Sequence, residues 1–372
     1  MRTRGRPIQL TGWKVNSSFK HSNSMKIGFV IYGPLNTLSG GYLYDRKLVE
    51  YLRAQGDTVE IISLPWRNYS AHLTDNLSFK LPADLDILIQ DELNHPSLIA
   101  ANSGKHPYPI ISLVHHLRCS ELRPKWQNDL YRVVEKKYLQ SVDGFIFNSK
   151  TTRDVVNSLL ESSKPEVVAY PPTDRFGDAI SDNEIIKRSK TNELRILFLG
   201  NIIERKGLHI LLEALIPSIV DLQLDIVGSL TTEPKYAKQM QERVMDKGLT
   251  SKVTFHSSLD NEFLKQKLQQ SHALIVPSSY EGFGIVYLEG MGFGLPAIGT
   301  TAGAAGEIIE HEKTGYLIKP NDHETLTSLI AQLASDRDLL AKISLNARKR
   351  YIQQPSWNET AGQIRAFLRS MI

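Results

Sequence analysis

The sequence predicts an α/β protein of two doubly wound domains that face each other across a cleft. The chain has 372 residues, about twice the length of a typical single domain. Short β-branched runs alternate with helical patterns, which is typical of parallel sheets covered on both faces. A polar, turn-rich segment over 171–193 divides this alternation into two series, and we interpret it as a linker.

The first series predicts an N-terminal domain over 25–170. Its helical patterns cover 42–55, 126–140 and 151–160. Its six expected strands are KIGFVIYG, which begins at Lys26, then TVEIISL, DILIQDE, PIISLVHH, GFIFNS and EVVAY.

The second series predicts a C-terminal domain over 194–350. Three helical segments beginning near Asp322, Asp336 and Ser356 close the chain. Open parallel sheets bind ligands beyond the carboxyl ends of their strands, so we expect the site between the two domains. The strands expected here are RILFLG, QLDIVG, KVTFHS, ALIVPS, PAIGTT and GYLIKP.

Composition and charge exclude several classes of protein. The chain is 41% hydrophobic and 23% charged, which is too apolar for a disordered protein, and no apolar run reaches the roughly 18 to 20 residues of a membrane-spanning helix. The single cysteine, Cys119, excludes an intramolecular disulfide, so we expect a cytoplasmic location. The net charge of +4 is compatible with several kinds of anionic partner and selects none.

The first 24 residues form a basic segment without an acidic residue or the apolar region of a secretory signal. We expect a disordered extension, with the folded protein beginning at Met25. Its cations are Arg2, Arg4, Arg6, Lys14 and Lys20.

The strongest chemical signal is SSYEGFGIVYLEGMGFGLPAIGTTAGAAGEII, where Glu281 and Glu289 stand eight positions apart. A glycine-rich turn between them joins a predicted strand to an apolar helix. Such a turn presents free backbone N–H groups and the positive end of the helix dipole, which suits a diphosphate. Carboxylates beside it are poor phosphate ligands but good acceptors for sugar hydroxyls. The pattern therefore predicts a sugar-diphosphate site.

This block resembles glycosyltransferase family 4, a family of retaining enzymes with the GT-B fold of two Rossmann-like domains, and the resemblance runs from Met25 to the C-terminus. It implies that Glu281 contacts the donor sugar and that Glu289 binds the ribose hydroxyls. The positions whose backbone would hold the sugar and diphosphate are Gly282, Phe283, Gly284 and Ile285.

The segment LFLGNIIERKGLHILLEAL resembles the family's strand, loop and helix whose arginine and lysine reach the donor diphosphate. Lys206 matches the lysine, whereas Asn201 stands where the arginine is usual. Arg205 either supplies the missing cation or is a solvated loop charge, and the sequence leaves both interpretations open.

Two further motifs are expected on the first domain's side of the cleft. In GPLNTLSGGYLYDRKLVEYL, Gly40 and Gly41 either let the backbone approach the donor phosphates, as the resemblance implies, or form a plain helix-starting turn. The absence of G-x-G-x-x-G argues against a dehydrogenase.

In PIISLVHHLRCSE, the resemblance implies that His115 contacts the donor sugar. His116 stands where many relatives carry an aspartate, and we place it on the acceptor side.

The remaining motifs are weaker. The resemblance implies that Gly228, His256 and Ser257 border the nucleotide. Glu307 matches a recurrent family glutamate, which we interpret as a helix-start cap. The closing segment SWNETAGQIRAFL resembles the helix by which GT-B chains cross back to the first domain, here over 351–372.

The sequence thus predicts a retaining glycosyltransferase that moves a hexose from a UDP- or GDP-sugar to a hydroxyl of a lipid or saccharide acceptor. No histidine and cysteine cluster has metal-ligand spacing, so we expect no metal or other cofactor. Lys206 and Arg205 would instead stabilise the leaving diphosphate.

Two alternatives remain: a non-catalytic nucleotide-sugar binding protein, and another GT-B enzyme such as a phosphorylase or epimerase. We expect no nucleic-acid partner, and the oligomeric state stays open.

The segment LRCSELRPKWQNDLYRVVEKKYL combines an apolar stripe with a group of cations. In one interpretation the helix packs its stripe on the first domain and solvates its charges. In the other, the basic edge rests on anionic lipid headgroups as a peripheral protein of the inner membrane face. The stripe is Trp126, Leu130, Val133 and Val134, and the cations are Arg118, Arg123, Lys125, Arg132, Lys136 and Lys137.

Overall fold

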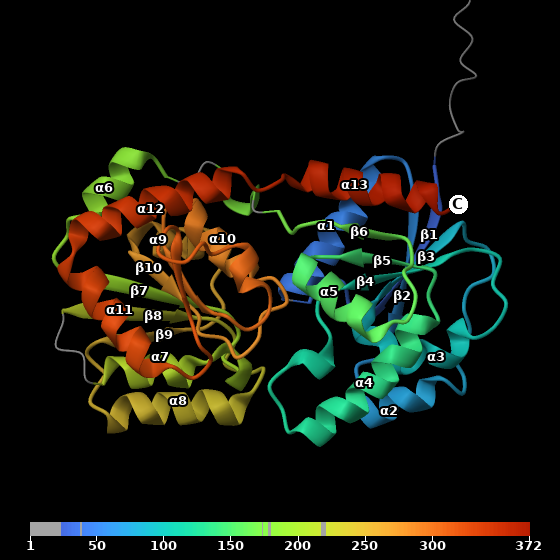
Figure 1. Cartoon of the computed structure of the whole chain (residues 1–372), viewed down its shortest axis with the longest axis horizontal. Coiled ribbons are helices and arrows are strands. Elements are labelled where there is room, and N and C mark those ends of the chain that lie inside the picture. The colour runs from blue at the N-terminus through green and yellow to red at the C-terminus, as the bar shows by residue number, and fades with distance from the viewer. Residues whose placement is uncertain (1–23, 38, 173, 178–179, 217–220) are drawn as a thin grey trace, which may run out of the picture.

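Two separate parallel sheets organise the chain into an N-terminal and a C-terminal half (Figure 1). The computed structural model describes residues 24–372 except 38, 173, 178–179 and 217–220, so the predicted basic extension falls almost entirely outside the described residues. Each sheet has six strands and helices on both faces, which confirms the predicted fold class. Within the described part, no helix is both long and apolar enough to span a bilayer.

The sheet of the N-terminal half has the order β2-β1-β3-β4-β5-β6. Its central strands are buried along their whole length, as expected for parallel strands covered on both faces. The strands are β1 (Lys26–Tyr32), β2 (Thr58–Leu64), β3 (Ile87–Asp91), β4 (Ile110–Val114), β5 (Gly144–Phe147) and β6 (Glu166–Val168). The helices are α1 (Gly40–Ala54), α2 (Tyr69–Asp75), η1 (Glu92–Asn94), α3 (His95–Asn102), η2 (Arg118–Ser120), α4 (Lys125–Gln140) and α5 (Lys150–Leu159).

The sheet of the C-terminal half has the order β12-β11-β10-β7-β8-β9. Its strands are β7 (Leu194–Leu199), β8 (Leu222–Val227), β9 (Val253–His256), β10 (Ala273–Ile275), β11 (Ala297–Thr300) and β12 (Gly315–Ile318). Its helices are η4 (Glu204–Lys206), α7 (Leu208–Leu215), α8 (Pro234–Asp246), α9 (Asn261–Gln270), α10 (Ile285–Gly292), η5 (Ala304–Glu307) and α11 (His323–Ser335). All twelve predicted strands are therefore present.

The chain crosses between the halves twice. The first crossing contains η3 (Asp174–Phe176) and α6 (Asp182–Ser189), so the predicted linker holds no strand in its described residues but does hold a capped helix. The second joins α12 (Arg337–Ile352) to α13 (Trp357–Ser370). The two crossings touch, because the Gln354 side chain donates to the carbonyl of Pro171 at 2.9 Å.

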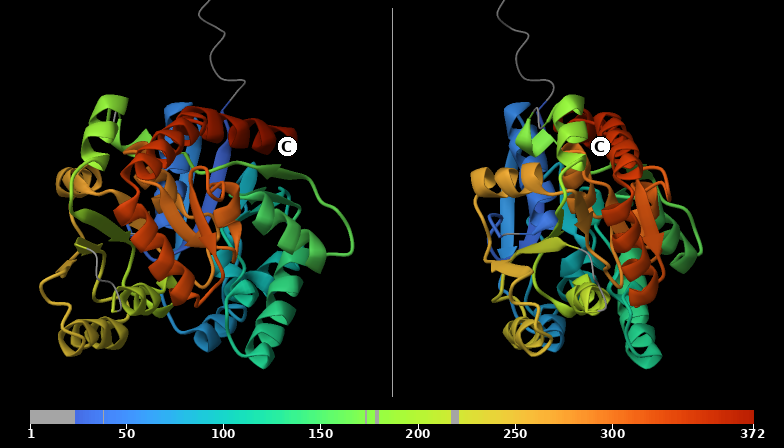
Figure 2. Two further views of the ribbon diagram at one scale, coloured as in Figure 1. Left: turned by 60° about the vertical axis from the view of Figure 1, so that its left-hand side comes forward. Right: turned by 90° about the vertical axis from the view of Figure 1, so that its left-hand side faces the viewer.

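Helix α13 belongs structurally to the N-terminal half, beside α1 (Figures 1 and 2). It contributes Ala361, Ile364 and Leu368 to the core around β1. Arg365 forms an ion pair with the buried Asp57, at 2.7 Å between Nε and Oδ2. The end of the chain therefore packs on the N-terminal half.

Candidate functional site

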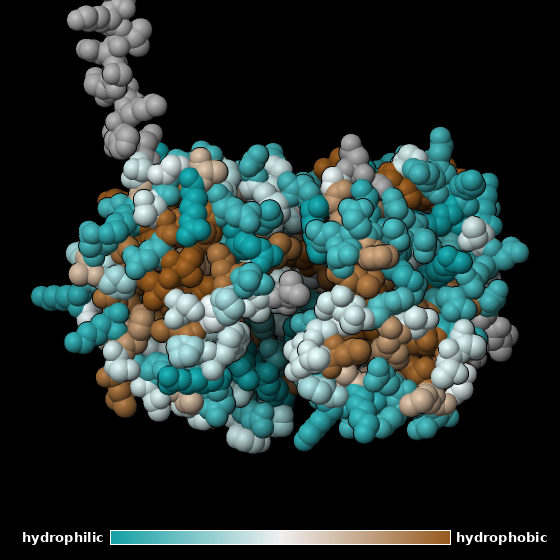
Figure 3. All heavy atoms as spheres, turned by 180° about the vertical axis from the view of Figure 1, so that it is seen from behind, coloured by the Kyte–Doolittle hydropathy of each residue, from teal (hydrophilic) through white to brown (hydrophobic). Residues whose placement is uncertain are grey.

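A cleft of about 1270 Å³ lies between the two halves, at the carboxyl ends of both sheets. Figure 3 shows the halves as two lobes with a groove between them. Both strand orders change direction here, between β1 and β3 and between β7 and β10, which is where doubly wound sheets bind ligands. The predicted residues that line the cleft are Gly40, Gly41, His115, His116, Asn201, Arg205, Lys206, Gly228, Glu281, Gly282, Phe283, Gly284, Ile285 and Glu289.

Lys206 and Glu281 form a buried ion pair between the Nζ and Oε1 atoms. Ser278 donates a hydrogen bond of 2.7 Å to the same oxygen. Burial opposes ionisation of Glu281, but the charges of Lys206 and Arg205 hold its pKa at about 2. Burial in turn lowers the pKa of Lys206, while Glu281 opposes this shift. The cleft thus contains a fixed carboxylate beside a fixed cation.

Gly207 explains how Lys206 reaches this position. It adopts a left-handed conformation (φ 72°) where η4 ends and α7 begins. A Cβ atom there would lie 2.1 Å from the carbonyl oxygen of Pro277, so only glycine fits this close approach. The turn therefore packs directly against the segment that carries Glu281.

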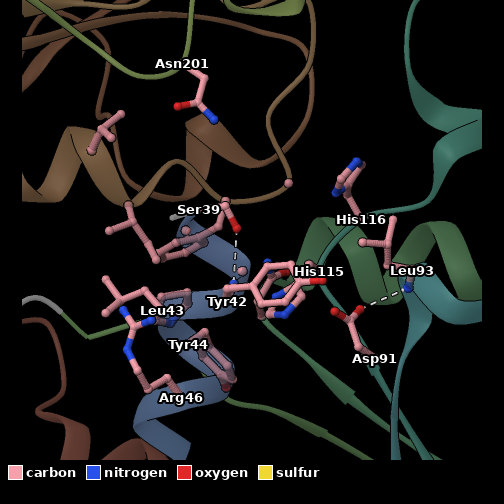
Figure 4. Close-up of a pocket in the computed structure, with 18 of the residues that line it drawn as sticks. Ser39, Tyr42, Leu43, Tyr44, Arg46, Asp91, Leu93, His115, His116 and Asn201 are labelled. Carbon is pink, nitrogen blue, oxygen red and sulfur yellow. Dashed lines mark hydrogen bonds between the residues drawn. The ribbon is translucent and has the colours of Figure 1, made fainter. Parts of the chain in front are cut away.

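Arg205 is not a solvated loop charge. Its guanidinium donates to the carbonyl of Tyr280 at 2.8 Å and lies 4.0 Å from Glu281 Oε2. The structure therefore brings Arg205 beside Lys206 at the cleft, and the side chain of Asn201 projects into it from the same half (Figure 4).

The glycine-rich turn delivers the start of α10 to the cleft. Gly284 is the N-cap, with a left-handed backbone (φ 95°) and no side-chain hydrogen bond to the first turn. A Cβ atom on Gly284 would lie 2.5 Å from the Tyr287 ring. The start of α10 therefore offers an anion the positive end of the helix dipole.

Glu289 lies one turn into α10 and is buried. Arg175, from η3 in the predicted linker, forms an ion pair of 2.9 Å with Glu289 Oε1. Burial raises the pKa of Glu289, and Arg175 opposes the shift. Sequence reasoning missed Arg175, because nothing in a polar linker indicates which of its charges turns toward the site.

His115 faces the cleft from the end of β4 (Figure 4). Its Nε2 lies 3.0 Å from Oδ1 of Asp45, a fully buried residue of α1. Burial alone would lower the pKa of His115, but Asp45 raises it to about 9. A Cβ atom on Gly41 would lie 3.2 Å from the His115 ring. The glycine pair therefore opens α1 and also leaves room for this ring.

Asp91, at the end of β3, completes the acidic surroundings of His115, and burial raises its pKa to about 8. Sequence reasoning missed both Asp45 and Asp91. The signal for Asp91 was present, because the predicted strand DILIQDE ends in acidic residues at its carboxyl end. Asp45 gave no such signal within an ordinary helical pattern.

The described residues contain two groups whose geometry could hold a metal ion. The groups are Asp45, Asp91 and His115, and Glu92, His95 and Glu135. Several of their polar atoms already have protein partners: His95 bonds Tyr69, Glu135 accepts two backbone amides and Asp45 Oδ1 holds His115. One oxygen in each group, Asp45 Oδ2 and Glu92 Oε1, is buried without a hydrogen-bond partner. The chain also has Asp-x-Asp pairs at 84–86 and 336–338, and neither lines the cleft.

The halves also make direct contact. Ser149 Oγ donates to the carbonyl of Gly282 at 3.0 Å. Glu307 does cap a helix start, but of α5 in the other half, by accepting from the amides of Lys150 and Thr151 at 3.0 and 2.7 Å. These contacts fix the start of α5 against the glycine-rich turn.

Two predicted nucleotide-bordering residues, His256 and Ser257, are not among those lining the cleft. The His256 side chain contacts Asp225, with 2.6 Å between Nε2 and Oδ1. The adjacent Ser258 and Leu259 line the cleft instead.

The predicted amphipathic helix is α4. It turns most of its apolar stripe to solvent, contrary to the interpretation in which the stripe packs on the first domain. Trp126, Leu130 and Val133 are 68%, 57% and 61% exposed and only Val134 is half-buried, so most of the stripe does not pack on the N-terminal half. The buried side of α4 carries Glu135, Tyr138 and Leu139.

Comparisons with known proteins agree with this architecture. Residues 181–350 match the family model described as Glycosyl transferases group 1. An uncharacterized glycosyltransferase of Methanocaldococcus jannaschii is 26% identical over 266 residues, 68% of this chain and 67% of that protein. The GDP-mannose-dependent alpha-(1-6)-phosphatidylinositol monomannoside mannosyltransferase of Mycobacterium tuberculosis is 30% identical over 210 residues, 53% of each chain. These alignments span about half to two thirds of the relatives.

Solved structures share the fold across almost the whole chain. Sucrose-phosphate synthase from Thermosynechococcus elongatus has a TM-score of 0.77 at 19% identity, covering 93% of this chain and 98% of that one. Anabaena HepE, solved in complex with UDP and glucose, has a TM-score of 0.73 at 20% identity, covering 93% of this chain and all of that one. The fold is therefore GT-B, and the sequence relatives are glycosyltransferases.

Proposed function

We propose that the protein is a retaining glycosyltransferase that moves a hexose from a UDP- or GDP-sugar to a hydroxyl of a lipid or saccharide acceptor. One observation carries the proposal. The Lys206 and Glu281 pair lies beside the start of α10 in the same cleft as His115. The cation and the helix start suit a diphosphate, and the carboxylate and imidazole suit sugar hydroxyls.

In this proposal the donor diphosphate lies between Lys206 and the start of α10. Charge on the leaving diphosphate grows as the bond between the anomeric carbon and the phosphate oxygen breaks. Lys206, Arg205 and the amides from Gly282 to Ile285 stabilise that charge in a preorganised site. Glu281 accepts hydrogen bonds from the sugar hydroxyls, and His115 donates one to the sugar. Glu289 holds the ribose after Arg175 is displaced.

The acceptor enters from the His116 side of the cleft. Its hydroxyl oxygen forms the new bond on the face from which the diphosphate leaves, and its proton passes to a leaving phosphate oxygen. This front-side route needs no protein nucleophile and retains the anomeric configuration. Protein cations supply the positive charge, so we propose that transfer is independent of a metal ion.

We also propose domain boundaries at the two crossings. The N-terminal acceptor-side domain covers 25–170, the linker 171–193, the nucleotide-sugar domain 194–350 and the returning segment 351–372. The contact between Gln354 and Pro171 joins both crossings. The cytoplasmic location stays a prediction.

A membrane-embedded acceptor is favoured by the exposed face of α4. Trp126, Leu130 and Val133 point away from the core. Lys125 and Arg132 on the same helix are exposed, and both lie near Asp129, at 3.6 and 3.4 Å. Aromatic and apolar side chains flanked by cations are typical of helices that lie at an anionic membrane surface. We propose that this face rests on anionic lipid.

The decisive experiment pairs binding with turnover. UDP- and GDP-sugars are screened by thermal shift, because a ligand of the native state raises the melting temperature, and released nucleoside diphosphate is then measured with and without excess EDTA. We expect one donor to stabilise the protein and to be turned over equally in EDTA, with the product's anomeric configuration, read by NMR, retained. Binding without release would indicate a non-catalytic module. Loss in EDTA that magnesium restores would contradict the metal-independent route.

A further inference from the structure

Arg118 lies on the acceptor side of the cleft, in η2 just after β4. Its guanidinium carbon is 5.2 Å from the ring centre of Tyr69 and 4.9 Å from that of Tyr131. The two rings meet edge to face, 4.9 Å apart. Aromatic faces attract a cation and fix its plane. The guanidinium is therefore held in one place before any ligand arrives.

Among the residues that the structure describes, no hydrogen bond or ion pair reaches the guanidinium of Arg118, and its Nε is buried without a partner. The neighbouring Arg123 differs, although it also lies over Tyr131. Its guanidinium bonds Glu121 at 2.6 Å and the carbonyl of Arg118 at 2.9 Å. Arg123 is therefore satisfied by the protein, whereas Arg118 is not.

The carboxyl groups near Arg118 are engaged elsewhere. Glu121 is shared by Arg123 and His116. Glu135 accepts the backbone amides of Arg118 and Cys119 at 2.6 and 3.2 Å. Burial raises the pKa of Glu135 to about 7 and that of Glu92 to about 8. Neither of these two supplies a full counter-charge near neutral pH.

Arg118 lies on a wall of the cleft that faces the position expected for the reacting sugar. His116, two residues before Arg118, has its ring centre 6.3 Å from that of Tyr280, the residue before Glu281. The wall that carries Arg118 therefore faces the expected sugar position from the opposite half of the cleft. An anion bound there would belong to the acceptor, because Lys206 and α10 serve the donor diphosphate from the C-terminal half.

We propose that Arg118 anchors a phosphate-binding subsite for the acceptor, so that the acceptor hydroxyl lies on a molecule that also carries a phosphate group. The inference rests on the proposed function. A planar guanidinium offers two parallel N–H donors to a phosphate, and an unpaired, half-buried cation is costly unless a ligand supplies its counter-charge. The phosphate could belong to a lipid headgroup or to a water-soluble polyol phosphate.

The test begins with the full chain saturated with the nucleoside diphosphate, UDP or GDP, that raises its melting temperature. The donor site is then filled, and inorganic phosphate is titrated by calorimetry. We expect Arg118→Gln to weaken phosphate binding at least tenfold and Arg118→Lys to fall between it and the wild type. The matched control Arg348→Gln, at an arginine that also lies over a tyrosine ring but outside the cleft, should bind like the wild type.

Turnover identifies the source of the phosphate. The same polyol is offered with and without a phosphate monoester, and anionic phospholipid vesicles are offered as a third acceptor. We expect at least a tenfold higher kcat/KM for a phosphate-bearing acceptor, water-soluble or lipid, and loss of that preference in Arg118→Gln. Nucleotide affinity and circular dichroism should stay at wild-type values, which separates this change from a folding defect.

Equal phosphate affinity in Arg118→Gln and Arg348→Gln would overturn the inference, as would phosphate that competes with the nucleotide. A preference for a carboxylate-bearing or neutral acceptor would also overturn it. If no nucleotide binds and none is released from any donor, the proposed function itself fails. If nucleotide binds normally but Arg118→Gln changes neither phosphate binding nor acceptor preference, only the inference about Arg118 fails.

Discussion

Lys206 and Glu281 depend on each other, because each charge is largely shielded from water and the other is its main partner. Removal of one partner of a buried pair leaves an uncompensated charge, which typically costs about 3–5 kcal/mol. Activity and stability should therefore respond together to a single substitution, and only a paired substitution separates them.

We predict that Lys206→Met lowers turnover by about 10²–10³, as does the loss of one donor that stabilises a developing anion. Its free energy of unfolding in urea should fall. Adding Glu281→Gln should restore most of the stability but none of the activity. A single variant with activity within twofold of the wild type would remove Lys206 from the site.

His115 predicts a pH dependence of stability with a definite sign. Its folded-state pKa of about 9 lies above the ordinary value of 6.5, with burial opposed by Asp45. The folded state therefore holds a proton that the unfolded state has released between these values. The stabilisation is complete below about pH 6.5 and disappears as the pH rises through about 9.

The measurement is urea unfolding of the wild type and His115→Gln at several pH values. We expect the wild type to lose up to about 3 kcal/mol relative to the variant between pH 6.5 and 9.5, from 1.36 kcal/mol per pKa unit. The comparison with the variant cancels groups that do not interact with His115, whereas the charge of Asp91 interacts with it and is part of the measured difference. A constant difference across the range would contradict the ion pair with Asp45.

The strands were predictable from the sequence, but the orientation of helix α4 was not. Runs of β-branched residues predict buried parallel strands because both of their faces must be apolar. The pattern of α4 predicts a stripe but not which side faces the core. Glu135 decides that orientation, because it accepts two backbone amides of η2. Such long-range bonds leave no periodic signal.

The candidate site was likewise predictable only in part. The cleft, Lys206 and the glycine-rich turn follow from motifs that place them at strand ends. Arg175 and Asp45 depend on side-chain directions across the fold, with an Arg175 to Glu289 pair formed from separate elements. Spacing in the sequence does not encode these meetings.

We predict that α4 mediates salt-sensitive sedimentation with vesicles of anionic lipid. Each cation near the surface contributes about 1 kcal/mol, and apolar side chains add burial. A triple variant should abolish sedimentation, with the changes Trp126→Ser, Lys125→Gln and Arg132→Gln. The control is Lys238→Gln, at an exposed helical cation of the C-terminal half, and it should sediment like the wild type. Equal binding to neutral vesicles would exclude the electrostatic part, and no binding at low salt would favour a water-soluble acceptor.

The two halves are joined by more than a linker. Helix α13 supplies core residues to the N-terminal half, and Glu307 caps α5 from the C-terminal half. We predict that Ile364→Ala lowers the free energy of unfolding by about 2–5 kcal/mol. The neighbouring exposed Gln363 is the control, and Gln363→Ala should change it by less than about 0.5 kcal/mol. The free energies of unfolding of both variants are measured with denaturant. Similar losses in Ile364→Ala and Gln363→Ala would show that the packing of α13 is dispensable.

The return of α13 also sets the order in which the protein can be completed during synthesis. The strands of the N-terminal half leave the ribosome first, yet Ile364 and Leu368, which finish their core, emerge about 200 residues later. At ~5–20 residues per second, the apolar surface that awaits them stays open for about 10–40 s. The nascent chain therefore passes through a period in which its earliest folded part is incomplete, and a chaperone that shields apolar surface would act then. A ribosome that stalls anywhere before residue 357 would release a chain whose first half lacks its last helix.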